Sequence, residues 1–90
     1  IVPTPGHTYG HQSVILRTND HSVFFAGDAT FTQQQLLDTK VAGICADKKA
    51  ARVTIKQIQD FGKNHAMIYL PSHDPASAKR LIERNTVQFF

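Results

Sequence analysis

The segment 47–61 constrains the fold most, because it predicts a helix set between two apolar runs. Its apolar residues recur at offsets of three and four, as along one face of an amphipathic helix, and are Ala51, Ile55, Ile58 and Phe61. Asp47 is the expected N-cap and Gly62 the expected stop. The apolar runs at 22–27 and 66–70 predict strands, and a helical crossover between them makes the two strands parallel.

The remaining segments predict a mixed α/β domain. The run "SVILRT" (13–18) is followed by the turn residues "NDH" and the strand at 22–27, which is typical of an antiparallel hairpin. The further expected elements are a short helix at 32–38, an irregular connection at 41–46, a helix at 75–84 capped by Asp74 with Pro75 at its first position, and a last strand at 86–90. No element is expected before the loop at 4–13. The order β-β-α-α-β-α-β fits one domain over residues 1–90.

Three loops of this arrangement are expected to meet at one edge of the sheet. In a hairpin, the loop before the first strand and the loop after the second lie side by side, so His7 and Asp28 become neighbours. A parallel strand at 66–70 ends at the same edge, which brings His73 to the other two. The topology therefore predicts a cluster of two imidazoles and one carboxylate.

Such a cluster suits zinc, iron, manganese or cobalt, whereas oxygen ligands alone would favour calcium or magnesium. Because a carboxylate has two oxygens, Asp28 can bridge two cations while His7 and His73 each serve one. That division is typical of a two-metal hydrolytic site. The alternative roles are structural: Asp28 as a helix cap or turn residue, and the histidines as surface hydrogen-bonding groups.

Other polar residues near these loops are interpreted as structural. Asp74 is taken as a helix cap and not a ligand, and His21 and His65 are assigned to structure or solvent. His11 is expected to hold the His7 loop by a hydrogen bond and not to bind metal itself.

Charge and cysteine content limit the classes of partner and the cellular compartment that we expect. The net charge is +3 with neutral histidines, but the lysines and arginines are scattered and not interleaved with aromatic residues, so a nucleic-acid partner is not expected. The chain has one cysteine, Cys45, and therefore no internal disulfide, which fits a reducing cytoplasm. No apolar run reaches the roughly 18 residues that a membrane span needs. A membrane partner is not expected either.

Three motifs together resemble one known family. "TPGHTYGHQS" (4–13), "FFAGDATF" (24–31) and "LPSHDP" (70–75), in that order and at those intervals, resemble the carboxyl-terminal half of the metallo-β-lactamase superfamily. The resemblance covers nearly the whole chain and is closest to the N-acyl homoserine lactonase branch. It implies half of an αβ/βα sandwich whose cleft holds two divalent transition metal ions, most often zinc.

The resemblance also implies roles for individual residues. His7 would bind the first metal, Asp28 would bridge both and take part in catalysis, and His73 would bind the second. The implied function is metal-dependent hydrolysis of a small-molecule lactone or ester, such as the homoserine lactones cleaved in quorum quenching. Phe31 and Tyr9 are the expected substrate contacts.

The chain departs from the family in its ligand count. The family's first metal motif, "HxHxDH", occurs nowhere in this sequence, so each metal would receive only two protein groups. A catalytic zinc usually has three protein ligands and water. We therefore expect a fragment that needs the amino-terminal half of its domain as a partner. Alone, it is expected to bind metal poorly, to be inactive and to self-associate.

The second departure concerns the substrate. Lactonases of this branch carry a tyrosine three residues after the bridging aspartate, where this chain has Phe31. The loss of that hydroxyl favours other carbonyl substrates over homoserine lactone, although Tyr9 could supply a hydroxyl. The alternatives are a hydroxyacylglutathione hydrolase-like thioesterase and a non-catalytic binding or assembly module.

Overall fold

The computed structural model describes residues 1–41, 43 and 45–89. Within them, the strands form one sheet in the order β1-β2-β3-β4. The strands are β1 (Val2–Pro3), β2 (Gln12–Arg17), β3 (Ser22–Gly27) and β4 (Met67–Pro71). β1–β2 and β2–β3 are antiparallel and β3–β4 is parallel. The expected mixed α/β class is confirmed, as are the hairpin and the parallel pairing.

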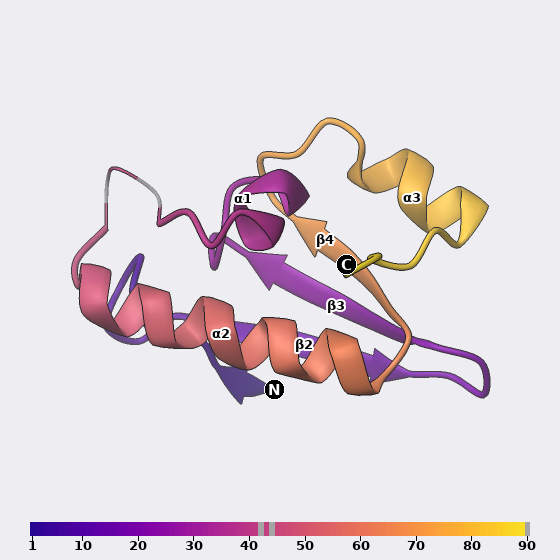
Figure 1. Cartoon of the computed structure of the whole chain (residues 1–90), viewed down its shortest axis with the longest axis horizontal. Helices are drawn as coiled ribbons and strands as arrows, with labels where there is room; N and C mark the ends of the chain where they lie inside the picture. The colour runs from indigo at the N-terminus through magenta and orange to yellow at the C-terminus, as the bar shows by residue number, and fades with distance from the viewer. Residues whose placement is uncertain (42, 44, 90) are drawn as a thin grey trace.

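The helices are α1 (Gln33–Leu37), α2 (Lys48–Asn64) and α3 (Ser77–Glu83). α2 is the crossover between β3 and β4 and lies across one face of the sheet, while α3 lies against β4 (Figure 1). Asp47 caps α2 as expected, because its side chain accepts a hydrogen bond from the Ala50 N–H. No helix in the described part of the chain is long and apolar enough to cross a membrane.

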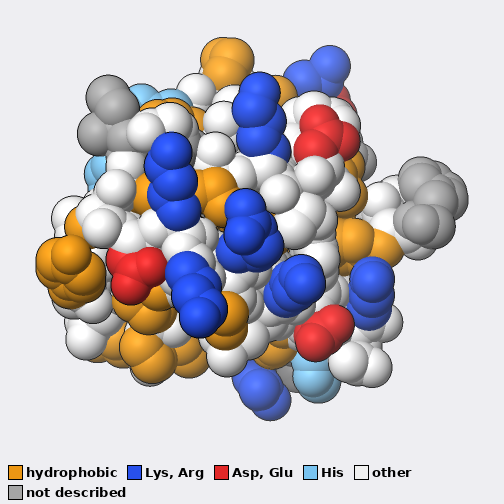
Figure 2. Space-filling model, turned by 60° about the vertical axis from the view of Figure 1, so that its left-hand side comes forward, with side chains coloured by type: hydrophobic (Ala, Val, Ile, Leu, Met, Phe, Trp, Pro, Cys, Tyr) orange, Lys and Arg blue, Asp and Glu red, His pale blue; other side chains and the backbone are white. Residues whose placement is uncertain are grey.

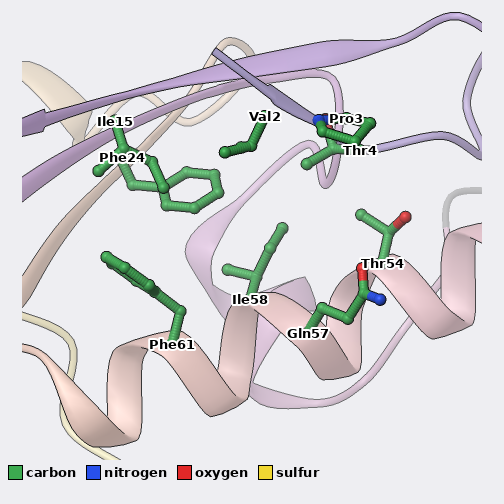
Figure 3. A pocket seen from close by; sticks show the side chains of 9 residues that line it. All are labelled: Val2, Pro3, Thr4, Ile15, Phe24, Thr54, Gln57, Ile58 and Phe61. Carbon is green, nitrogen blue, oxygen red and sulfur yellow. The ribbon is translucent and has the colours of Figure 1, made fainter.

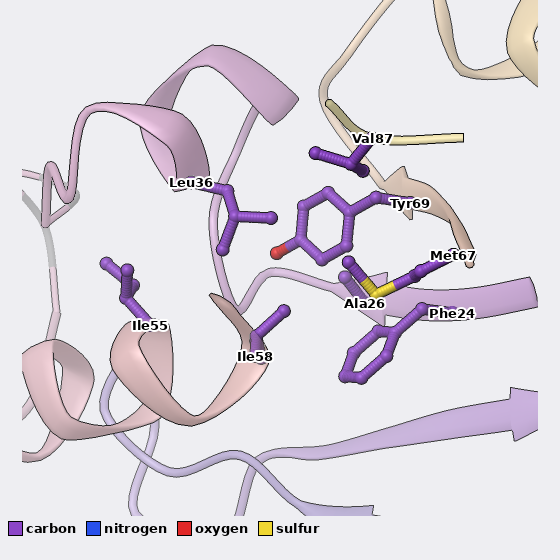
Figure 4. Packing of buried hydrophobic residues seen from close by; sticks show 8 residues of the cluster. All are labelled: Phe24, Ala26, Leu36, Ile55, Ile58, Met67, Tyr69 and Val87. Carbon is purple, nitrogen blue, oxygen red and sulfur yellow. The ribbon is translucent and has the colours of Figure 1, made fainter. Parts of the chain in front are cut away.

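The core lies between the sheet and α2. Alternate residues of β3 and β4 point to this side, and the buried cluster consists of Phe24, Ala26, Leu36, Ile55, Ile58, Met67, Tyr69 and Val87 (Figure 4). Tyr69 is fully buried, and its hydroxyl lies 2.9 Å from Thr30 Oγ1. Thr30 Oγ1 in turn donates to the Thr32 carbonyl, so Tyr69 is the donor to Thr30. This core therefore reaches the loop that carries Asp28.

Gly62 does not end α2, contrary to the expectation from sequence. The helix runs on to Asn64 and is capped at His65. A Cβ atom at Gly62 would lie 2.7 Å from Phe89 Cε2 and 2.9 Å from Met67 Cε. Gly62 thus allows Phe89 and Met67 to pack closely against the helix. The sequence pattern alone does not distinguish such a glycine from one that ends a helix.

The predicted capping of α3 by Asp74 is wrong. α3 begins at Ser77, and its N-cap position is Ala76, whose side chain makes no capping bond. Asp74 Oδ1 instead accepts the Ala76 N–H, which forms a turn ahead of the helix. Pro75 lies in that turn, and the other Asp74 oxygen, Oδ2, accepts the Gln33 N–H of α1.

Both ends of the chain differ from expectation. β1 pairs with β2 ahead of the loop at 4–13, where no element was expected. The strand predicted at 86–90 is absent over the described residues 86–89, which form an irregular segment joined to β4 by the Val87 N–H, 2.8 Å from the Met67 carbonyl. Burial of Val87 in the core explains the apolar pattern without a ladder. The irregular connection expected at 41–46 contains residues 42 and 44, which lie outside the described residues.

Basic side chains of α2 point away from the core. Figure 2 shows lysine and arginine side chains spaced across one face of the molecule, with acidic ones among them. The exposed basic residues of α2 are Lys48, Lys49, Arg52, Lys56 and Lys63. This is the charge pattern of an amphipathic helix whose other face packs on a sheet.

The second face of the sheet is partly uncovered and predicts self-association. Val14, Leu16 and Phe25 are 46%, 54% and 43% exposed, and Val14 pairs directly with Phe25 across the strands. We expect the isolated 90-residue chain to elute as dimers or larger species in size-exclusion chromatography, because contiguous apolar patches drive association.

Leu16→Lys is expected to shift that equilibrium toward monomer. Val53→Lys is the matched control, because Val53 is 52% exposed but lies on α2, away from the strands. A monomeric wild-type chain at high concentration would contradict the prediction.

Candidate metal centre

Three loops bring His7, Asp28 and His73 together. His7 lies between β1 and β2, Asp28 directly follows β3, and His73 lies two residues beyond β4. His7 Nε2 is 3.5 Å from Asp28 Oδ2, and His73 Nε2 is 3.1 Å from Asp28 Oδ1. The structure thus shows the juxtaposition that the hairpin and the crossover predicted.

Each carboxylate oxygen of Asp28 has one histidine beside it. Among the described residues, no group of three or more His, Cys, Asp or Glu side chains could hold a metal ion together. Two ligands of a tetrahedral zinc lie about 3.4 Å apart when each bond is about 2.1 Å. The His7–Asp28 and His73–Asp28 distances are close to that separation. The donors fit two half-sites that share one carboxylate.

Asp28 is held in its ionised form. The Ser72 hydroxyl donates a hydrogen bond to Oδ1 and is the main reason that the pKa of Asp28 lies below its ordinary value of 3.8. Partial burial of the carboxyl opposes this shift, while His7, His73 and His11 add to it. An ionised carboxylate is the form that binds cations. Ser72 was not singled out from the sequence, although it directly precedes His73.

The Phe31 ring contacts both histidines, whereas Tyr9 contacts neither in the bonds described below. The Phe31 ring centroid is 5.6 Å from that of His7 and 4.7 Å from that of His73, with edge-on geometry in both pairs. The Phe31 N–H donates to Gln35 Oε1, which fixes this residue at the start of α1. Tyr9 is 76% exposed, and its hydroxyl donates to the Ala46 carbonyl at 3.4 Å, ahead of α2.

The His7 loop is attached to the start of α2. The Asp47 N–H donates to the Gly6 carbonyl at 2.9 Å, and the Ala46 N–H donates to the His7 carbonyl at 3.0 Å. Gly6 has φ +144°, and a Cβ atom there would lie 2.4 Å from Ala51 Cα. The glycine therefore lets the loop backbone rest directly on the helix.

The His73 loop is attached to α1 and α3 through Asp74. Its Oδ2 accepts the Gln33 N–H at 2.9 Å and pairs with Arg80 Nη2 at 3.1 Å. The Asp74 and Arg80 side chains are 9% and 12% exposed, and Arg80 also donates to the Tyr69 carbonyl. Asp74 thus has a structural role, as expected, but as a link between elements. Sequence spacing gave no signal for its pairing with Arg80.

A separate apolar cavity of about 170 Å³ lies between β1–β3 and α2, lined mainly by Val2, Ile15, Phe24, Ile58 and Phe61 (Figure 3). His7, Asp28 and His73 do not line it, and it contains no titratable side chain. The cavity is therefore distinct from the cluster of histidines around Asp28.

No protein-family model matches the chain. Solved structures do. An N-acyl homoserine lactone hydrolase with N-hexanoyl-L-homoserine at its catalytic metal centre matches 98% of this chain at 29% identity and a TM-score of 0.74, over 33% of its own length. The AiiA protein of B. thuringiensis, as a variant with N-decanoyl-L-homoserine bound, gives the same identity, coverages and TM-score.

The hydrolase AbOPH of the β-lactamase superfamily matches 84% of this chain and 27% of its own, at 31% identity and a TM-score of 0.66. These matches confirm the resemblance to the metallo-β-lactamase superfamily. Within the superfamily, the resemblance is to the lactonase branch. The chain spans about a third of the length of the lactonases it matches. Its four-stranded mixed sheet and helices correspond to a part of the metallo-β-lactamase fold.

Proposed function

We propose that this chain supplies part of the binuclear metal site of a metallo-β-lactamase superfamily hydrolase. One observation carries the proposal: Asp28 Oδ2 faces His7 and Asp28 Oδ1 faces His73, so one carboxylate separates two imidazoles. That is the donor arrangement in which each oxygen serves a different cation. The catalytic metal centre of the similar lactone hydrolase supports it.

Each residue of the cluster then has a defined task. His7 and His73 would each hold one divalent transition metal ion, most often zinc, and Asp28 would hold both. When bound, such ions polarise a carbonyl and activate water at neutral pH. Ser72 keeps the Asp28 carboxylate ionised and oriented. The Phe31 ring packs edge-on against both imidazoles and limits the directions that they can take.

The remaining ligands would come from outside the chain. His7 with Asp28, and His73 with Asp28, give each ion two protein ligands, one fewer than a catalytic zinc usually has. We infer that the chain is a carboxyl-terminal part of its domain and that the amino-terminal part completes both sites. The exposed row of Val14, Leu16 and Phe25 gives that part an apolar surface to cover.

The substrate proposed is a small molecule with a lactone or ester carbonyl. The acyl homoserine products in the similar structures support this class. Phe31 offers a ring and no hydroxyl, and the Tyr9 hydroxyl is directed to Ala46, so a substrate would be held near the cluster by apolar contact. A glutathione thioester is the second candidate, and parallel assays of the intact protein on both substrates separate them.

Metal analysis tests the proposal. We expect the intact protein to bind about two transition metal ions and His7→Ala to lose one of them with its activity, since a missing ligand leaves an incomplete site. His21→Ala is the matched control, because His21 lies in the β2–β3 turn. The isolated chain is expected to bind metal weakly.

The opposite outcome identifies a different class of protein. Intact protein without transition metal, whose measured activities survive His7→Ala, would show a non-catalytic binding or assembly module with structural histidines.

A further inference from the structure

His11 lies behind the Asp28 carboxylate and touches the Asp28 backbone. The Asp28 N–H donates to His11 Nε2 at 3.0 Å. The other ring nitrogen, Nδ1, lies 2.8 Å from Thr4 Oγ1. Gly27 makes room for the ring, since a Cβ atom there would lie 3.0 Å from Nε2. The bond to Thr4 holds the loop that contains His7, as expected, and the bond to the Asp28 amide is a further contact.

These contacts determine which ring nitrogen of His11 carries the proton. A backbone N–H can only donate, so Nε2 must be an unprotonated acceptor. The proton of the neutral ring is then on Nδ1, which donates it to Thr4 Oγ1. The hydroxyl protons beyond Thr4 are determined in the same way.

The chain of hydrogen bonds ends at β3. Ser13 Oγ donates to the Ala26 carbonyl at 3.2 Å, so its own proton is committed there. Thr4 must therefore donate to Ser13 Oγ, 2.8 Å away. Thr4 and Ser13 are only 4% and 1% exposed, which shields their hydrogen bonds from competing water. Every donor from Asp28 to Ala26 has one acceptor.

We propose that His11 is a positioning residue that sets the direction of the Asp28 carboxylate through the Asp28 amide, with Thr4 and Ser13 fixing its Nδ1–H tautomer. The Ala26 carbonyl anchors one end of the chain in β3, and the Asp28 amide is the other end. The Asp28 amide is thereby linked to β2 through Ser13 and to β3 through the Ala26 carbonyl. The inference rests on the proposed metal site only for its functional consequence.

The tautomer is tested first, without metal. In ¹⁵N-labelled protein we expect the His11 resonances of a protonated Nδ1 and an unprotonated Nε2, and a scalar coupling across the hydrogen bond between the Asp28 amide nitrogen and Nε2. His21 in the same spectra is the internal reference. A proton on His11 Nε2 would overturn the proposal whatever the protein binds.

Cobalt(II) titration of the intact protein tests the functional consequence. Thr4→Val removes the acceptor of the Nδ1–H with little change in shape, and we expect about a tenfold loss of cobalt affinity, as for other residues that orient metal ligands. Thr4→Ser keeps the hydroxyl and is expected to restore affinity. Equal cobalt affinity in wild type and Thr4→Val would overturn the positioning role.

The two readouts separate this inference from the proposed function. Absence of cobalt binding in wild type, with the expected His11 tautomer, would end the metal proposal and leave the hydrogen-bond chain intact. Two bound cobalt ions together with a proton on His11 Nε2 would support the metal proposal and overturn the hydrogen-bond chain.

Discussion

Gly6→Ala is expected to destabilise the protein by about 4 kcal/mol or more, at the upper end of single substitutions. The added Cβ would lie 2.4 Å from Ala51 Cα and 2.7 Å from Ala51 N, which are backbone atoms of α2 that no side-chain rotation can move. The φ of +144° adds strain for any L side chain. The His7 loop must therefore separate from α2 or the helix must shift.

The loss is measured by urea unfolding, together with metal content, because a displaced loop also moves His7. Gly10→Ala is the matched control in the same loop: a Cβ atom there meets nothing within 4 Å. We expect it to change the free energy of unfolding by less than about 0.5 kcal/mol. Equal stability of the two variants would contradict the contact between the loop and α2.

The positions of the three cluster residues could be predicted because they depend on topology alone. The hairpin turn after "SVILRT" and the helical period of 47–61 fix which strand ends meet. Strand ends then carry His7, Asp28 and His73 to one edge, whatever the side-chain details. Hydrophobic period and turn chemistry are local signals, so one sequence suffices to read them.

Partners between elements could not be predicted in this way. The bond from the Asp28 amide to His11 and the pairing of Asp74 with Arg80 depend on side-chain direction across separate loops. The local sequence pattern also gave two wrong predictions. It predicted a helix end at Gly62, where the glycine allows tight packing, and a strand at 86–90, where Val87 is buried in the core without strand pairing. In each case tertiary contact decided the outcome.

The cluster is supported from two sides that do not share residues. Gly6 and α2 hold the loop of His7, while Asp74 and Arg80 hold the loop of His73. Asp28 lies between them and is fixed through His11 and Ser72. A substitution on either side should therefore move one histidine and leave the other near Asp28.

Asp74→Ala is expected to cost about 3 kcal/mol of stability and to release His73. Removing the carboxylate leaves Arg80 buried without its counter-charge and takes the acceptor from the Gln33 and Ala76 amides. Urea unfolding measures the loss. Because His73 directly precedes Asp74, metal content should fall together with stability, whereas His7 and its loop are untouched.

The pH dependence of the unfolding free energy distinguishes a stabilising Asp74–Arg80 ion pair from packing of the same side chains without charge. Burial alone would raise the pKa of Asp74, but the Gln33 and Ala76 amides and the Arg80 guanidinium outweigh it and lower the pKa below 3.8. A carboxyl whose pKa is lower in the folded state stabilises above the unfolded pKa, and this contribution is lost as pH falls through the folded pKa. Wild type should therefore lose stability below about pH 4 more steeply than Asp74→Ala. Asp60→Ala is the control, because Asp60 lies on the exposed side of α2, and its pH profile of unfolding free energy should follow that of the wild type. Parallel pH profiles for wild type and Asp74→Ala would refute the ion pair.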